Sequence, residues 1–206
     1  MATSRTTTTL ILAAATAGIL AGGTFAAFSA PGPAANNPAG QSTAPTAAAT
    51  SHYSFMETST PSRLIIPSIS VNASVQAVGV TADGTMDVAH NYKDVGWYEY
   101  GPVPGAPGSA VIEGHLDTAV VPYAVFYNLD KVKPGDDVEI IDQKGRTLHF
   151  AVTAVKSYPY NAPTTDVFTS PNNGESFLNL VTCDGTWIEA KHIYDERLVV
   201  FTKRTN

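Results

Sequence analysis

The chain has 206 residues, of which 44% are hydrophobic, enough for one globular domain with appendages but not for two large domains. Its formal net charge is −6, and an acidic chain is a poor candidate for nucleic-acid binding. The sequence has no CxxC pair, no HExxH and no glycine-rich phosphate loop, which excludes the usual zinc, metalloprotease and nucleotide sites. We therefore expect no cofactor and no metal.

The N-terminal stretch is strongly apolar. Few polar residues interrupt the run from Leu10 to Phe28, which follows Arg5 and as a helix would be roughly 28 Å long, close to the thickness of a bilayer's hydrocarbon core. A cleaved signal peptide fits equally well, because Thr24 and Ala26 offer an A-x-A-like cleavage site. A buried core helix is a third possibility, weakened by two adjacent glycines. We expect residues 1–28 to be an export signal or membrane anchor.

The next segment, residues 29–62, is rich in Ala, Pro and Thr and contains very few large apolar side chains. Such a composition cannot bury enough surface to offset the entropy cost of ordering the chain. The segment is predicted to be a disordered linker. It either holds the folded domain away from a membrane or cell-wall layer, or is a tail with no spacing role.

The folded domain is predicted to span residues 63–206. Apolar and polar residues alternate after Arg63, which indicates two short strands interrupted at Pro67. Glycine- and proline-containing turns separate the later segments. The further predicted strands are Ser109–Gly114, Asp137–Asp142, Thr147–Ser157, Phe177–Thr182 and Arg197–Lys203, and the predicted short helices are Tyr123–Leu129 and Thr164–Phe168. About seven to eight short strands joined by turns indicate an all-β barrel or sandwich.

Cys183 is the only cysteine of the chain. In an exported protein it cannot form an internal disulfide, so it is a buried small hydrophobe, an intermolecular bridge or a reactive thiol. The sequence places it where a strand gives way to the turn at Asp184-Gly185, and a strand end is a rigid mount for a nucleophile. Arg197 begins the next predicted strand. If the two strands are neighbours, a thiol and a guanidinium share one site.

Five histidines could serve such a thiol. His115 is favoured because it follows a predicted strand directly and stands beside Gly114, which permits close backbone approach. His192 is an alternative, since it lies between Cys183 and Arg197 in sequence. A site without any catalytic histidine also remains open at this point.

Three segments resemble motifs of the sortases, the cysteine transpeptidases of Gram-positive cell surfaces. Asn179-Leu180-Val181-Thr182-Cys183 resembles the family's TLxTC strand end, Gly114-His115-Leu116-Asp117 its histidine motif, and Glu196-Arg197-Leu198-Val199-Val200 its arginine motif. The motifs occur in the family's order, and the resemblance spans roughly Arg63 to Lys203. Three spaced motifs in order are a specific signal, whereas any one alone is weak.

Within the family, the segments Val78–Val88 and Val95–Asp117 are most similar to actinobacterial class F sortases. The chain departs from the family pattern at two positions. Asn179 stands where Thr is frequent, which bears on substrate preference. Glu113 stands where a small residue commonly precedes Gly-His, and it shares strand parity with His115. Its carboxylate is either close enough to act on the histidine's protonation or solvated and without effect.

The resemblance implies a closed sortase-type β-barrel of about eight strands with a few short helices. It also implies that Cys183 attacks an LPxTG-like sorting signal between Thr and Gly, that Arg197 stabilises the oxyanion, and that His115 carries the proton. Thr182 would contact the substrate. The expected partners are sorting-signal peptides of surface proteins, a peptidoglycan precursor amine, and the membrane through the N-terminal segment.

Two alternatives remain beside this expectation. An L,D-transpeptidase also acts on peptidoglycan outside the membrane, but its cysteine is preceded by Ser-His-Gly, where this chain has Leu180-Val181-Thr182. An anchored extracellular binding domain with a buried, unreactive Cys183 would have the same composition. The expected location is the cell membrane, spanned once, with the catalytic domain outside.

Overall fold

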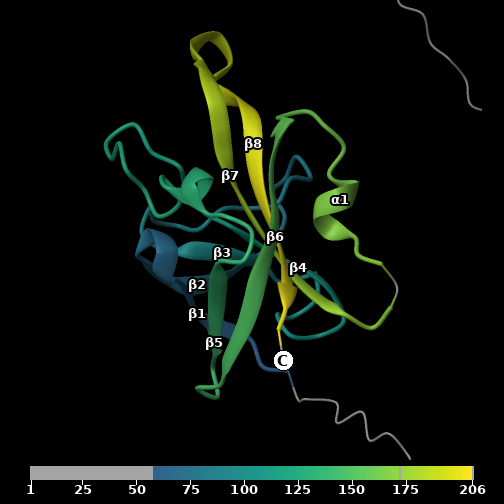
Figure 1. Ribbon diagram of the computed structural model, residues 1–206. Coiled ribbons are helices and arrows are strands. Elements are labelled where there is room, and N and C mark those ends of the chain that lie inside the picture. The colour runs from purple at the N-terminus through teal and green to yellow at the C-terminus, as the bar shows by residue number, and fades with distance from the viewer. Residues whose placement is uncertain (1–57, 172, 206) are drawn as a thin grey trace, which may run out of the picture. The chain divides into compact units, whose positions relative to one another are not determined.

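The computed structural model describes residues 58–171 and 173–205, and these form a closed barrel of eight strands in the order β1-β2-β3-β4-β7-β8-β6-β5 (Figure 1). The strands are β1 (Pro61–Ile66), β2 (Val71–Val78), β3 (Val95–Tyr98), β4 (Gly108–Glu113), β5 (Asp137–Asp142), β6 (Thr147–Pro159), β7 (Ser176–Ile188) and β8 (Ile193–Arg204). The only α-helix among the described residues is the single-turn α1 (Thr165–Phe168). The predicted all-β barrel with few helices is confirmed.

The first two strands form as the alternation predicts. Pro67 ends β1 and opens a short 3-10 turn, η1 (Pro67–Ile69), after which β2 returns antiparallel to β1. Leu64 and Ile66 point inward and have no exposed surface. The predicted anchor and most of the predicted linker lie outside the described residues. Within residues 58–171 and 173–205, no helix has the length and apolar character needed to cross a membrane.

The barrel interior is filled by alternate residues of every strand, so its wall has an apolar inner face. Leu178, Leu180 and Val200 of the central strands are fully buried in this core. Because the side-chain period of a strand is two, the odd-numbered residues of this part of β7, including Cys183, face outward. The candidate site must therefore lie on the outside of the barrel wall.

The segment Tyr123–Leu129 is not the helix that its composition predicts. Three of its amides bond outside the segment: Ala124 N donates to Leu116 O at 3.1 Å, Val125 N to Tyr92 O at 2.9 Å, and Phe126 N to His115 O at 2.9 Å. The amides of Tyr127 and Leu129 make turn bonds to carbonyls three residues earlier. Only a short 3-10 turn, η2 (Leu129–Lys131), forms at its end. Phe126 is fully buried and anchors this irregular segment beneath the strand end that carries the histidine.

The last two strands are longer than predicted. β7 continues past Cys183 to Ile188, and β8 begins at Ile193 instead of at Arg197, so the two form a hairpin that projects beyond the barrel (Figure 1). The register shifts between Asp184 and Trp187, where Gly185 adopts φ 80°. A bulge at this glycine absorbs the predicted turn and lets strand pairing resume. Cys183 thus lies within a strand, next to the bulge.

Candidate active site

A groove of about 670 Å³ runs along the outer face of strands β4, β7 and β8. Its floor is a second, smaller apolar cluster formed by Val111, Val181 and Val199, one residue from each strand. Val167 of α1 packs on this floor from the side. The lining also includes aromatic side chains from several elements, namely Tyr98, Tyr158, Tyr160 and Phe168. The result is an elongated, largely apolar depression with polar groups at one end.

Strand register brings the predicted residues to that polar end. β4 and β7 are parallel, with Glu113 opposite Val181, and Gly114 N donates to Val181 O at 3.1 Å. Two residues further along both segments, Cys183 therefore lies beside His115. β7 and β8 are antiparallel, with Cys183 directly opposite Arg197. All three side chains line the groove. The cysteine therefore lies between a histidine and an arginine on neighbouring strands.

The Cys183 thiol is partly buried, and burial raises its pKa above the ordinary value. The charge of Arg197 acts in the opposite direction, whereas the carboxylates of Asp117 and Glu113 add to the rise. Before substrate binds, the neutral thiol is thus favoured over the thiolate. For such a thiol to act as a nucleophile, a base would have to take the proton from the sulfur.

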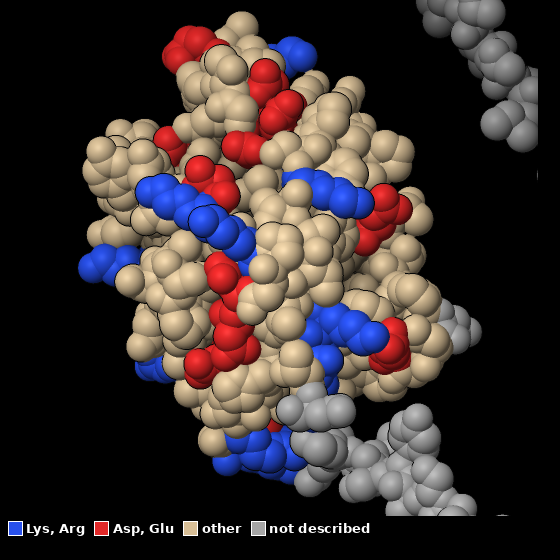
Figure 2. Space-filling view, in the orientation of Figure 1, with Lys and Arg blue, Asp and Glu red and all other residues tan. Residues whose placement is uncertain are grey.

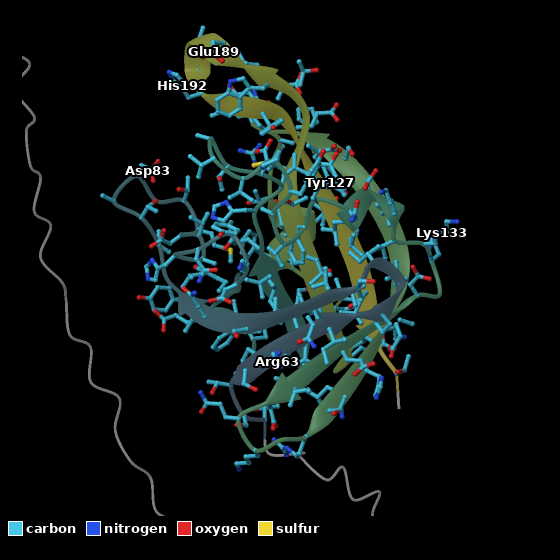
Figure 3. The ribbon with its side chains drawn as sticks, turned by 90° about the vertical axis from the view of Figure 1, so that its left-hand side faces the viewer. Arg63, Asp83, Tyr127, Lys133, Glu189 and His192 are labelled. Atoms are coloured by element: carbon cyan, nitrogen blue, oxygen red, sulfur yellow. The ribbon has the colours of Figure 1, made fainter. Side chains whose placement is uncertain are left out.

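His115 is the only histidine among the described residues that lines the groove. Its Nε2 lies 3.3 Å from the Ala89 carbonyl oxygen. His149 pairs with Asp137 on the outer face of β5 and β6, and His192 lies at the tip of the β7–β8 hairpin, with Glu189, as Figure 3 shows. His90 is exposed in a loop, and His52 lies outside the described residues.

Arg197 is held in place by backbone carbonyls. Its Nη1 donates to Glu196 O at 2.8 Å and to Tyr194 O at 3.2 Å. Other arginines lie elsewhere: Arg63, at the opposite end of the barrel from His192 in Figure 3, bonds Asn72, and Arg146 pairs with Asp142. Arg204 is partly buried and donates to Gly105 O. None of these three lines the groove.

Comparison with known proteins identifies the family. The model of the sortase domain matches residues 64–205. The chain belongs to the sortase family. The match favours a sortase over the L,D-transpeptidase and binding-domain alternatives and, with the fold, makes the protein a transpeptidase by family. A search of curated proteins gave no match.

Solved sortases have the same fold. Sortase C-1 from Actinomyces oris is 25% identical, with a TM-score of 0.55 over 70% of this chain and 73% of that one. Sortase A from Corynebacterium diphtheriae, solved as a lid mutant, is 26% identical, with a TM-score of 0.56 over 73% of this chain and 72% of that one. Sortase C2 of Group B Streptococcus pilus island 1 is 26% identical, with a TM-score of 0.53 over 70% and 73%.

Two residues of the cysteine motif support the site of this sortase from below. Thr182 points into the barrel, is buried, and donates from Oγ1 to Gly114 O at 2.8 Å, which ties the cysteine strand to the histidine strand. Asn179 is buried and donates from Nδ2 to Val167 O at 2.6 Å. Asn179, which stands where the family often has Thr, thus binds α1, and α1 forms one wall of the groove.

One contact was not anticipated from the sequence. The Tyr194 hydroxyl donates to Asp117 Oδ2 at 2.5 Å, and this hydrogen bond, together with partial burial, raises the tyrosine pKa to about 12. The bond joins the loop after His115 to the start of β8, near Arg197. Only the spacing of two residues between His115 and Asp117 could have suggested it, and nothing in the sequence marks Tyr194 as the partner.

Among the described residues, the side chains that could together hold a metal ion are Asp137, Glu139 and His149, whose ligand atoms lie within 4.8 Å of one another. They belong to β5 and β6 and do not line the groove.

Proposed function

We propose that this sortase cleaves LPxTG-like sorting signals between Thr and Gly and transfers the acyl group to a cell-wall amine, thereby anchoring surface proteins. The observation that carries the proposal is the cross-strand placement of Cys183 between His115 and Arg197 at the polar end of an apolar groove. An extended peptide fits such a groove. Its apolar side chains would contact the floor of Val111, Val181 and Val199, and its scissile carbonyl would lie over the sulfur.

In the first half-reaction the Cys183 sulfur attacks the Thr carbonyl carbon. A carbon–sulfur bond forms, the thiol proton passes to His115, and negative charge develops on the carbonyl oxygen. Arg197 stabilises this oxyanion, because a guanidinium remains charged and presents several donors in a fixed plane. The intermediate then collapses: the carbon–nitrogen bond breaks, and His115 gives its proton to the departing glycine amine.

In the second half-reaction an amine opens the thioester. His115 accepts the amine's proton as a new carbon–nitrogen bond forms, and the sulfur leaves and is protonated again. A second hollow, of about 220 Å³, reaches Cys183 from the other side and is lined by Asp130, Asp184 and Lys131 among others. Figure 2 shows acidic side chains gathered over the upper part of the molecule, at the β7–β8 hairpin. The carboxylates of Asp130 and Asp184 at this hollow would favour the approach of an ammonium group.

We also propose that residues 1–28 stay attached as a membrane anchor with the N-terminus in the cytoplasm, that residues 29–62 space the domain from the membrane, and that the protein is of the class F type. The apolar run after Arg5 and the similarity of Val78–Val88 to class F sequences support this arrangement. The N-terminal sequence of membrane-extracted protein tests the anchor. A mature start between Ala26 and Pro33 would contradict it.

The deciding experiment is mass spectrometry of the full-length protein incubated with a panel of LPxTG-like peptides in the absence of an amine. The expected result is a mass increase equal to the acyl portion ending in Thr, located on Cys183 by proteolysis. Failure of every peptide to give an adduct, while a small thiol reagent still modifies Cys183, would contradict the proposal.

A further inference from the structure

Glu113 occupies an unusual position for a carboxylate. It lies at the end of β4, two residues before His115, lines the groove, and is partly buried. Within residues 58–171 and 173–205, no cationic side chain is among the groups that act on its charge. The hydrogen bonds it accepts come from the backbone amides of Ala89 and Gly96, and the nearby charge is that of Asp87. A buried carboxylate without a cation is costly. A small or apolar residue at this position would avoid the cost.

The carboxylate and the imidazole meet at one residue. Glu113 Oε1 accepts a hydrogen bond from Ala89 N at 2.6 Å, and His115 Nε2 lies 3.3 Å from Ala89 O. Both side chains line the groove, and the two peptide groups of Ala89 contact one each. Glu113 and His115 are thus linked indirectly through Ala89, whose amide binds the carboxylate and whose carbonyl oxygen contacts the imidazole.

The segment that carries Ala89 has no regular structure of its own. Residues 87–89 belong to no strand or helix, yet Ala89 is buried, with 2% of its surface exposed. An irregular buried segment needs specific partners for its amides. Glu113 supplies the partner for Ala89, and the side chain of Gln76 accepts from the amide of His90, the next residue.

Space for the carboxylate is provided by a glycine. Gly96 of β3 stands opposite Glu113, and a Cβ atom at this position would lie 2.7 Å from Glu113 Oε1. The close approach of the carboxylate to the β3 backbone is therefore possible only without a side chain at residue 96.

The contact with Ala89 O also decides which histidine nitrogen exchanges protons. A carbonyl oxygen only accepts hydrogen bonds, so Nε2 must carry the hydrogen in this contact. The lone pair of the neutral imidazole is then on Nδ1. Since the orientation and tautomer of a histidine are set by the bond that its other nitrogen makes, the Ala89 carbonyl defines Nδ1 as the basic atom.

We propose that Glu113 is a positioning residue: by binding the Ala89 amide it fixes the Ala89 carbonyl that holds His115 as the Nε2–H tautomer, with Nδ1 as the nitrogen that exchanges protons. The catalytic consequence rests on the proposed role of His115 as the proton carrier. The structural claim, which concerns the tautomer, does not depend on any activity.

The test is long-range ¹H–¹⁵N NMR of full-length protein labelled at histidine, recorded at alkaline pH, with the His115 signals assigned by their loss in His115→Asn. Wild type should show a protonated Nε2 and an unprotonated Nδ1. Glu113→Met, which fills the space but cannot accept a hydrogen bond, should give a mixture of tautomers and reduce kcat for peptide cleavage about tenfold with little change in KM. Glu113→Gln keeps an acceptor oxygen and should restore the wild-type spectrum.

Asp142→Ala is the matched control, because Asp142 is also buried and accepts backbone amide bonds, but at the β5–β6 hairpin. It should leave the His115 signals unchanged. A wild-type spectrum with the hydrogen on Nδ1, a folded Glu113→Met with the wild-type tautomer, or a Glu113→Gln as perturbed as Glu113→Met would each overturn the proposal. A correct tautomer pattern in a protein without peptide cleavage would instead refute the proposed function alone.

Discussion

Two carboxylates, the fully buried Asp142 and the partly buried Glu113, are held in different ways. At the β5–β6 hairpin, burial alone would raise the pKa of Asp142, but hydrogen bonds from the backbone and side chain of Arg146 and from the Lys144 amide, together with the guanidinium charge, bring it below the ordinary value. At the groove, burial raises the pKa of Glu113 to about 7, despite hydrogen bonds from Ala89 and Gly96.

The difference indicates a structural role for Asp142 and a functional role for Glu113. Asp142 has a cationic partner and closes a tight turn, so its charge stabilises the fold. Glu113 has no cationic partner in the part of the chain that the structure describes, and its charge opposes folding, as expected where a site is built for function at a cost in stability. Among the described residues, Arg197 is the arginine that lines the groove, and it stands opposite the thiol of Cys183. Breaking either arrangement should therefore have a different consequence in each case.

The largest effect is expected from removing the proposed nucleophile or the proposed proton carrier. Cys183→Ala should abolish both cleavage and transfer, and His115→Ala should come close to it, because the two residues act as a unit and their losses do not add. His192→Ala and His149→Ala should stay near wild type, since both lie away from the groove. Peptide cleavage measured by chromatography checks this. A His192→Ala variant as inactive as His115→Ala would show that the histidine is misassigned.

Removing Arg197 should cost less, but still a great deal. Loss of one oxyanion donor typically costs about 2.7 to 4 kcal/mol, or roughly a hundred- to thousand-fold in rate. Arg197→Lys keeps the charge without the planar fork and should recover only part of this. Arg63→Ala is the control, because Arg63 bonds Asn72 and does not line the groove. Steady-state cleavage by variants with native circular dichroism measures the effect, and a folded Arg197→Ala within about threefold of wild type would refute the role.

At the groove, Glu113 should make stability fall as pH rises. Its pKa is about 7 in the folded protein against an ordinary 4.5, so between these values the folded state binds more protons than the unfolded state, and deprotonation favours unfolding. The loss amounts to about 3 kcal/mol at most and less for a partly exposed group. Glu113→Gln should remove it. Urea unfolding at pH values below and above this interval gives the slope, and identical slopes for both proteins would exclude this assignment.

At the β5–β6 hairpin, Asp142 should act with the opposite sign. Its lowered pKa means that its contribution is present above the ordinary carboxylate pKa and is lost as pH falls through the folded value. Asp142→Ala should reduce the free energy of unfolding at neutral pH by about 1 to 3 kcal/mol, because the hairpin amides lose their acceptor. The difference from wild type should shrink in acid. The activity of the variant should be unchanged under conditions where it is fully folded. A loss of activity under those conditions would contradict a purely structural role for Asp142.

Much of the fold could be predicted from the sequence. Alternation located most strands, and the break at Pro67 and the hairpin after Asp142 formed as expected, because local turn chemistry decides them. The helix predicted at Tyr123–Leu129 was wrong because tertiary hydrogen bonds outweigh propensity there. The predicted C-terminal end of β7 and the predicted start of β8 were wrong, because Gly185 forms a bulge within the strand pair and not a turn that ends it.

The candidate site divides in the same way. Cys183, His115 and Arg197 were predicted by type, position and motif order, and the structure places all three at the groove. Their catalytic roles stay a prediction. The link from Glu113 through Ala89 to His115, and the bond between Tyr194 and Asp117, depend on loops returning to the groove from distant parts of the chain. No local pattern encodes such returns. The parity of Glu113 and His115 indicated a relation between them but not the residue that mediates it.

The central claim is that one thiol, at the functional end of the barrel, serves two substrates in turn. Initial rates of product formation over a matrix of peptide and amine concentrations test it most directly, because a covalent intermediate gives ping-pong kinetics. Double-reciprocal plots should be parallel, and product should accumulate only with Cys183 present. Intersecting lines would mean that peptide and amine must bind together before any bond breaks, and would contradict the account.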